Sequence, residues 1–298
     1  RSRLSHQRAR TGGDNEGSKK LLAKLDWNID KNNKATVRYN YSKSSSVSRP
    51  SSSGDARPTI SGSRHSATGG MSFENSQYRA AGSLQSVTAE LNSKLSNAVS
   101  NKLLAAYTSY SQPREYDGGF FPFIDILDGD ATKSNVRMSA GTELFSYENA
   151  VKNNTLILTD NLTYQMGNHT FTGGVSYENQ YVSNSYIRQG SGYYRFKNIE
   201  AFEKYINGEG VGKAYNSDYH PLSFAFTYPI NGNTKSLAEL GFGQFSLYGQ
   251  DEWDITKSFK LTYGLRIDLP MYHSGAVDNP ALANFAFRDG EKVDLSTW

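Results

Sequence analysis

The chain has 298 residues, with 20 Tyr, 15 Phe, no Cys and a mean hydropathy of -0.63. The lack of Cys excludes a disulfide scaffold and any thiolate metal site. Its 32 basic and 29 acidic residues are interspersed and leave a net charge of +3, which is too small to indicate a nucleic acid partner. No stretch approaches the roughly 20 apolar residues of a membrane helix, so any membrane span must use strands of about 9 to 11 residues.

Eight runs along the chain alternate apolar and polar side chains. A strand turns successive side chains to opposite faces, so each run predicts a strand with one apolar and one polar face. Short polar hinges join the runs in pairs, which predicts four hairpins. In chain order the runs lie at 21–30, 34–41, 87–95, 102–110, 155–165, 170–181, 244–255 and 260–269, and the fourth alternates less cleanly than the others.

The last hairpin, QFSLYGQDEWDITKSFKLTYGLRIDL at 244–269, carries charge on its polar face. A soluble sandwich would turn that face to bulk water, whereas a large outer-membrane barrel turns it to a wet lumen. The negative mean hydropathy agrees with a membrane location, because only alternate strand residues meet lipid and the loops are polar. The sequence therefore predicts an all-β fold, an antiparallel transmembrane β-barrel segment with long extracellular loops.

The alternation also assigns a direction to each side chain. If the barrel interpretation holds, apolar positions face outer-membrane lipid and charged positions face the lumen. We expect Leu25, Trp27, Leu158, Tyr164, Leu247, Trp253, Leu265 and Ile267 to point outward and Arg38, Glu90, Glu252 and Arg266 to point inward.

Connection lengths predict the orientation, because barrels of this kind have short periplasmic turns and longer outer loops. The short connections lie near 31–33, 96–100, 166–168 and 256–258, and long segments lie at 43–76, 112–152 and 184–242. The run at 135–145 also alternates. Counting it as a membrane strand would put the turn at 166–168 on the outer side, so we assign it to an ordered extension of the second outer loop.

Three aromatic residues, Trp27, Tyr164 and Trp253, fall on the predicted outward face close to the short turns. Amphipathic rings at that height form the aromatic girdle expected at the bilayer interface. The alternative is strand packing in a soluble protein, which the repetition on three strands disfavours.

A second aromatic set lies in the long loops. These side chains are candidates for contacts to substrate or to a surface lipoprotein, or they form small cores that keep the loops folded, and we favour the structural interpretation. The set comprises Phe120, Phe121, Phe123, Tyr193, Tyr194 and Phe196. Nearby, NIEAFEKYI spaces Ile199, Phe202 and Ile206 three and four residues apart, which predicts a short amphipathic helix covered by a neighbouring loop.

No pattern in the chain indicates catalysis, a cofactor or a metal. The five His, at 6, 65, 169, 220 and 273, are scattered over predicted turns and loops, and solvated loop histidines are favoured over a zinc site. No G-x-S-x-G elbow is present. Asp125, Asp128 and Asp130 in DILDGD lack an EF-hand spacing, so we favour a solvated loop over a calcium site. We predict that the protein is not an enzyme.

The last hairpin resembles the barrel strands of TonB-dependent outer-membrane transporters, which commonly carry a Y-x-Q-D-E/T-W element followed by T-x-G-L-R-x-D. The matching residues here are Tyr248, Gln250, Asp251, Glu252 and Trp253, then Thr262, Gly264, Leu265, Arg266 and Asp268. Further stretches from about Lys19 to Pro270, including VTAELNSKLSNAVSNKL and LTDNLTYQMGNHTFTGGVSYE, are similar to the Oar-like branch of that family.

The resemblance implies a barrel of roughly 22 strands, plugged by an internal domain and energised by TonB. The chain shows neither a recognisable plug nor a TonB box, and it begins RSRLSHQRAR without an initiator Met or signal-peptide hydrophobic region. We therefore expect residues 1–298 to be a central part of one barrel domain from a longer or processed protein. Its partners would be lipid, TonB through the absent plug, a substrate of unknown identity and a surface lipoprotein.

Two other functions stay open. A stand-alone eight-stranded barrel acting as an adhesin or structural anchor is the main alternative, but its lumen is only wide enough for side chains and would have to hold many charges. An outer-membrane enzyme would need a His and a carboxylate converging at one height, which the sequence does not indicate. An intact mass near 33 kDa would favour the small barrel, and a much larger mass the transporter.

Overall fold

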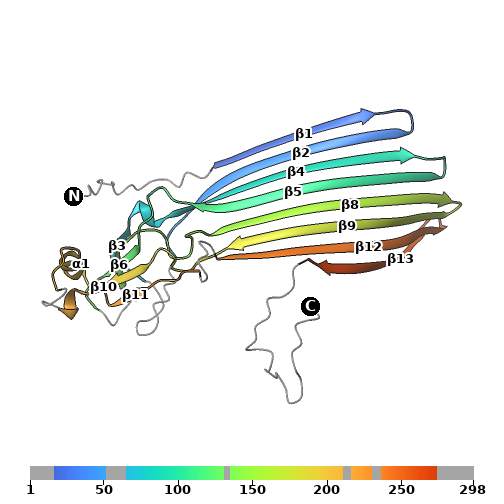
Figure 1. The fold of residues 1–298 in the computed structure, drawn as a ribbon. Helices are drawn as coiled ribbons and strands as arrows, with labels where there is room; N and C mark the ends of the chain where they lie inside the picture. The colour runs from blue at the N-terminus through green and yellow to red at the C-terminus, as the bar shows by residue number, and fades with distance from the viewer. Residues whose placement is uncertain (1–16, 52–64, 131–134, 211–215, 230–235, 274–298) are drawn as a thin grey trace, which may run out of the picture.

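The computed structural model describes residues 17–51, 65–130, 135–210, 216–229 and 236–273. Most of them form one antiparallel sheet of eight strands that follow each other in chain order (Figure 1). Across the sheet these are β1 (Gly17–Asn28), β2 (Asn33–Ser48), β4 (Tyr78–Lys94), β5 (Val99–Glu115), β8 (Ala150–Met166), β9 (His169–Ser185), β12 (Leu237–Thr256) and β13 (Phe259–Tyr272). The eight strands predicted from alternation are confirmed.

Four short turns join these strands in pairs, and all four lie at one end of the sheet, as predicted (Figure 1). In the first turn the Asp30 carboxylate accepts hydrogen bonds from the backbone N–H groups of Asn32 (2.7 Å) and Asn33 (3.0 Å). A hydrogen bond from the Asn33 side chain, together with the bond from the Asn32 N–H, lowers the pKa of Asp30. Gly167 adopts a φ of 60° in the two-residue turn between β8 and β9, a conformation that favours glycine. We call this the short-turn end.

The strands are longer than a membrane crossing requires. The shortest, β1, has 12 residues and the longest, β12, has 20, whereas about 9 to 11 suffice for a tilted transmembrane strand. The sequence underestimated these lengths because alternation fades toward the opposite end, which we call the loop end. Where water reaches both faces of a strand, the hydrogen-bonded ladder continues without any need for an apolar face.

The sheet is open. Within the described residues β1 pairs only with β2, and β13 pairs only with β12. These two strands are the edges of an eight-stranded arc (Figure 1). The strands that carry Leu25 and Leu265 are therefore at opposite edges of the sheet and do not pair with each other.

A second, five-stranded sheet lies at the loop end, and we call it the loop sheet (Figure 1). Its strands come from all three long loops, and parallel pairing joins the first loop to the second and the second to the third. In order across the sheet they are β11 (Ser223–Ala225), β10 (Tyr193–Phe196), β6 (Phe123–Leu127), β7 (Asn135–Ala140) and β3 (His65–Ser72). The assignment of the run at 135–145 to an ordered part of the second loop is confirmed by β7.

The loop sheet has its own small core. Phe123, Leu144 and Tyr193 pack together and are almost fully buried. Asp125 is also fully buried and accepts hydrogen bonds from the hydroxyls of Tyr193 (2.6 Å) and Ser139 (2.8 Å). The prediction that DILDGD is a solvated loop is thus wrong for Asp125, because this residue lies on β6 and its side chain points into the core.

The hydroxyl of Tyr193 is expected to stabilise the loop sheet. Tyr193→Phe removes a donor from a buried carboxylate, so it should destabilise the loop sheet by about 1–3 kcal/mol. Hydrogen exchange of the β6 and β10 amides measures this loss. Tyr194→Phe is the matched control, because in the described part of the chain the Tyr194 hydroxyl makes no hydrogen bond and its ring packs on Phe224 at 4.7 Å. Equal exchange in the two variants would contradict the role assigned to the Tyr193 hydroxyl.

In the described parts of the loops, a short α-helix, α1 (Ile199–Ile206), follows β10, and there are two 3₁₀ helices, η1 (Glu74–Ser76) and η3 (Ser217–Tyr219). The Asn198 side chain caps α1 by accepting from the backbone N–H of Ala201 at 2.9 Å. The helix is confirmed, but its predicted contact face is only partly right. Phe202 packs edge-on against Phe196, whereas Ile199 and Ile206 are exposed.

Candidate functional site: the two faces of the open sheet

The register aligns the eight strands into rows of paired residues whose side chains share a face. One row crosses the whole sheet with apolar or aromatic side chains only. It consists of Leu25, Val37, Ala89, Ala105, Leu158, Tyr177, Phe245 and Leu269. We call the face that contains this row the apolar face, and the opposite one the polar face.

Every residue for which the sequence predicted a direction falls on the expected face. The eight predicted outward residues occupy the apolar face, where Leu265 is 73% exposed and Leu25 66%. Arg38, Glu90, Glu252 and Arg266 occupy the polar face. An apolar surface this extensive on a sheet is unfavourable in water.

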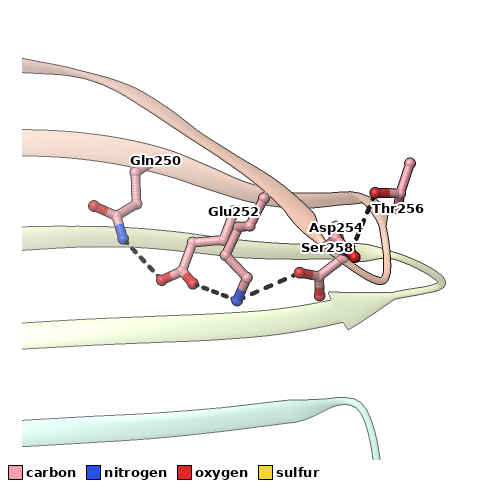
Figure 2. A network of polar contacts seen from close by, with 6 residues as sticks. Gln250, Glu252, Asp254, Thr256 and Ser258 are labelled. Carbon is pink, nitrogen blue, oxygen red and sulfur yellow. Dashed lines mark hydrogen bonds and ion pairs between the residues drawn. The ribbon is translucent and has the colours of Figure 1, made fainter.

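The polar face carries ion pairs along much of its length. At the short-turn end Lys260 Nζ lies 3.2 Å from Glu252 and 3.6 Å from Asp254. Figure 2 shows this network continuing from Glu252 to Gln250 on the same side of the hairpin. Exposed pairs of this kind contribute only about 0–1 kcal/mol each, so the charges need water around them.

A cavity of about 170 Å³ opens on the polar face over β1, β2 and β4. It is lined by charges of both signs, among them Asp26, Lys34, Arg38 and Glu90. Lys34 lies 3.4 Å from Asp26, while Glu90 pairs with Lys102 at 3.0 Å. The wall is therefore suited to contact water or a polar surface and unsuited to a dry core.

The predicted girdle residues Trp27, Tyr164 and Trp253 all lie on the apolar face and are 62%, 42% and 36% exposed. The structure adds two rings between the last two. His169 stacks on Trp253 (5.2 Å between ring centroids) and on Phe171 (5.5 Å), and Phe171 in turn stacks on Tyr164 (6.5 Å). Four rings thus form a continuous series beside the turn between β8 and β9.

Two carboxylates on the apolar face were missed by sequence reasoning. Asp160 lies in the same row as Leu103 and Val175, and Asn101 donates a hydrogen bond to it at 2.6 Å. The Asp251 side chain is only 4% exposed, and its Oδ2 lies 2.7 Å from His169 Nδ1 and accepts from the Tyr263 hydroxyl at 2.8 Å. The alternation of side chains along each strand would have placed both carboxylates on this face, but their partners depend on the register between strands.

The loop aromatics separate into two groups. Tyr193 and Phe196 are 1% and 2% exposed, so in this conformation they belong to the loop core and make no outside contact. Tyr194 is half-buried. Phe120 and Phe121 are 61% and 41% exposed and remain available to a partner.

A cavity of about 340 Å³ lies where β5 and β8 meet the second long loop. Phe120 and Tyr147, whose ring centroids are 4.9 Å apart, line it together with Arg114. Tyr116 also lines this cavity, and burial raises the pKa of its hydroxyl. The cavity combines aromatic walls with a cation.

The described residues contain no group of three or more His, Cys, Asp or Glu side chains able to hold a metal ion. Nor do they include a helix of the length and apolar character that crossing a membrane would require.

A family model described as outer membrane beta barrel domain matches residues 5–294. The chain belongs to this family. As an outer membrane β-barrel domain it lies in the bacterial outer membrane, and its eight-stranded antiparallel sheet is the fold expected there. No curated protein matches the chain.

Among solved structures, the chain is similar to three receptors at low identity. The ferric-catecholate import receptor Fiu from E. coli K12 shares 14% identity over 89% of this chain and 39% of its own, with a TM-score of 0.47. The ferripyoverdine receptor of the Pseudomonas aeruginosa outer membrane shares 14% over 88% and 32%, with a TM-score of 0.48. The siderophore receptor PiuA from Acinetobacter baumannii shares 10% over 89% and 40%, with a TM-score of 0.38. The chain thus spans about a third to two fifths of the length of these proteins.

Proposed function

We propose that this chain is part of the barrel of a TonB-dependent outer-membrane transporter. The observation that carries the proposal is the open sheet with a charged polar face. In hydrocarbon each unsatisfied backbone group costs several kcal/mol, so an open edge does not persist in a bilayer. The edges at β1 and β13 therefore require further strands, which the rest of a longer polypeptide would supply.

Closure of these eight strands on themselves is disfavoured by the charge of the polar face. A barrel of eight strands has a lumen just wide enough for side chains. Packing Lys34, Arg38, Glu90, Glu252 and Arg266 into so narrow a tube would remove their water, which is costly for ionised groups. A barrel of roughly 22 strands keeps them hydrated or in contact with an internal plug.

In the proposed mechanism the outer loops and the plug capture a substrate, TonB drives a rearrangement of the plug, and the substrate passes along the polar face. No covalent bond is made or broken. The resemblance to the Oar-like branch supports this proposal. The exposed rings of Phe120 and Phe121 are the proposed contacts to the substrate or to a surface lipoprotein.

The apolar face is proposed to contact lipid, with Trp27, Tyr164 and Trp253 in the girdle at the periplasmic interface. The short-turn end would then lie in the periplasm and the loop sheet outside the cell. This orientation agrees with strands that extend beyond the membrane only at the loop end.

Single-cysteine labelling of the full polypeptide tests this orientation. Residues 1–298 contain no Cys, and any Cys elsewhere in the polypeptide is replaced first. On intact cells a membrane-impermeant maleimide should label Phe120→Cys and should not label Lys257→Cys in the last short turn. After the outer membrane is permeabilised, both positions should react. Labelling of position 257 on intact cells would reverse the orientation.

The mass of the native polypeptide and its binding to TonB test the function. We expect a mass several times the 33.1 kDa of this chain, and capture of the detergent-extracted protein by the periplasmic domain of TonB. A native mass near 33 kDa would instead favour the stand-alone barrel acting as an adhesin or anchor. A large protein that TonB does not capture would keep the large barrel and remove the transport mechanism.

A further inference from the structure

Asp251 is a buried carboxylate on a face that otherwise carries few charges. Within the described residues its Oδ1 has no hydrogen-bond partner, and its Oδ2 is approached by Tyr263 and His169. Burial without compensation is costly for a carboxylate, so a cation beside it is favoured. From the row of Leu25 to the short turns, the described strands present one basic side chain on the apolar face, that of His169.

This pairing makes Nδ1 of the His169 imidazole a hydrogen-bond donor. A carboxylate accepts hydrogen bonds, so Nδ1–H of His169 donates to Asp251 Oδ2 across 2.7 Å. A ring that also carries a proton on Nε2 is an imidazolium, the counter-charge of this carboxylate. Among the titratable groups around it, Asp251 on β12 contacts the imidazole, Tyr263 on β13 donates to the same Asp251 oxygen, and Tyr164 on β8 stacks on Phe171 beside it. The His169 side chain is 29% exposed, so Nε2–H is available to a ligand.

The rings of Trp253 and Phe171 both stack on His169, with interplanar angles of 16° and 4°. The imidazole ring is therefore oriented before any ligand arrives. It lies two residues from the turn at Gly167, at the level where headgroups meet the aromatic girdle.

An apolar trough of about 430 Å³ begins beside this ring series and runs toward the middle of the strands. Tyr164 and Phe171 bound it near the short turns, and Val175 and Leu247 bound it farther along. Asp160, which accepts a hydrogen bond from Asn101 at 2.6 Å, also lines it. Gly173 lies between the two ends, and among the described residues a Cβ there would meet only the Tyr248 carbonyl oxygen, at 3.9 Å. Apart from Asp160, the side chains of the apolar face that line the trough are apolar or aromatic, which suits one hydrocarbon chain.

We infer that His169 and this trough form a binding site for one phospholipid of the periplasmic leaflet. The phosphate accepts a charge-assisted hydrogen bond from His169 Nε2–H, and an acyl chain occupies the trough over Gly173. The inference rests on the proposed lipid contact of the apolar face. It concerns a defined lipid position on the barrel wall and no step of transport.

Native mass spectrometry of the full polypeptide purified from the outer membrane tests the site. The probes are phosphatidylglycerol, which has a phosphate and no amine, and diacylglycerol with the same acyl chains. Wild type should retain phosphatidylglycerol and lose diacylglycerol. His169→Phe keeps an aromatic ring in the stack and removes the donor, so retention should fall about tenfold or more. Gly173→Leu fills the trough and should lower retention while His169 stays intact.

The matched control is His273→Phe, which removes the imidazole bonded to Asn179 near the loop end and should leave retention unchanged. Equal retention of diacylglycerol, or full retention by His169→Phe, would overturn the phosphate contact. Displacement by inorganic phosphate would assign the site to free phosphate and overturn the lipid assignment.

The protonation state has its own readout. In the wild type with phosphatidylglycerol bound, ¹⁵N NMR should find a proton on both ring nitrogens of His169. A neutral ring in the wild type would overturn the inference. A nitroxide at position 265 distinguishes failure of the phospholipid site from failure of the proposed lipid face. If the nitroxide contacts oxygen dissolved in lipid while the phospholipid is not retained, only the phospholipid site is wrong. If the nitroxide contacts water, the proposed lipid face is wrong as well.

Discussion

Leu158→Arg should destabilise the barrel by up to about 2–4 kcal/mol, the cost of a basic side chain on the lipid face near the bilayer midplane. Leu158 lies in the apolar row that crosses the whole sheet, with Ala105 and Tyr177 as its paired neighbours. A guanidinium at this position would have to reach water past several apolar residues. Reversible unfolding by guanidinium chloride in lipid vesicles measures the free-energy difference.

The adjacent residue provides the control. Thr159 is on the polar face, where its hydroxyl meets that of Ser176 at 3.2 Å. Thr159→Arg introduces the same side chain on a face that already carries Lys and Arg, so its effect should be small. Similar costs at positions 158 and 159 would mean that the two faces do not meet different environments.

Gly141→Ala should disrupt the loop sheet and leave the membrane strands intact. Gly141 has a φ of 102°, and an added Cβ would lie 2.7 Å from the Pro122 carbonyl carbon, 2.8 Å from Phe123 Cα and closer still to the Pro122 oxygen. All three atoms are backbone and cannot rotate away. Overpacking of about 1–3 kcal/mol and backbone strain of about 1–3 kcal/mol together predict a cost of about 2–6 kcal/mol. Faster hydrogen exchange in β6 and β7 would report it.

Gly129 separates the two contributions. It has a φ of 108°, but no atom of the described residues lies within 4 Å of the position that an added Cβ would take. Gly129→Ala therefore carries the backbone strain alone, and its effect should be the smaller of the two. If both variants exchange equally fast, the close contact with Pro122 is not what requires glycine at position 141.

The membrane strands were predictable because their signal is local. Lipid on one face and water on the other impose a period of two on each strand, so Leu158 and Thr159 reveal opposite faces without any knowledge of their neighbours. Short polar hinges such as that at Asp30 then predict the short turns. Because short and long connections alternate along the chain, all the short turns are predicted at one end.

The loop sheet was not predictable in the same way. Its strands have only three to eight residues and pair across different loops, so the partner of β10 lies about 70 residues away on β6. Of the five strands in the loop sheet, only β7 was indicated by alternating apolar and polar residues. Asp125 was misinterpreted for this reason, because nothing in DILDGD reveals that Tyr193 and Ser139 close over it.

The His169–Asp251 pair illustrates a third limit. Both residues were visible in the sequence, but they are 82 positions apart and meet only through the register of β9 on β12. The alternation along a strand assigns each residue to a face but does not determine the register between neighbouring strands. A contact between polar groups on one face therefore needs the structure.

The order of strands in the loop sheet has a mechanical consequence. The central pair, β6 and β7, belongs to the second loop, and hydrogen-bonded neighbours from the third and first loops flank it on either side. None of the three long loops can move independently, because displacing one breaks the backbone hydrogen bonds that its strand shares with a strand of another loop. Any movement of the loop sheet is thus a concerted movement of the three loops. A protease cut in a single loop should therefore loosen all three together.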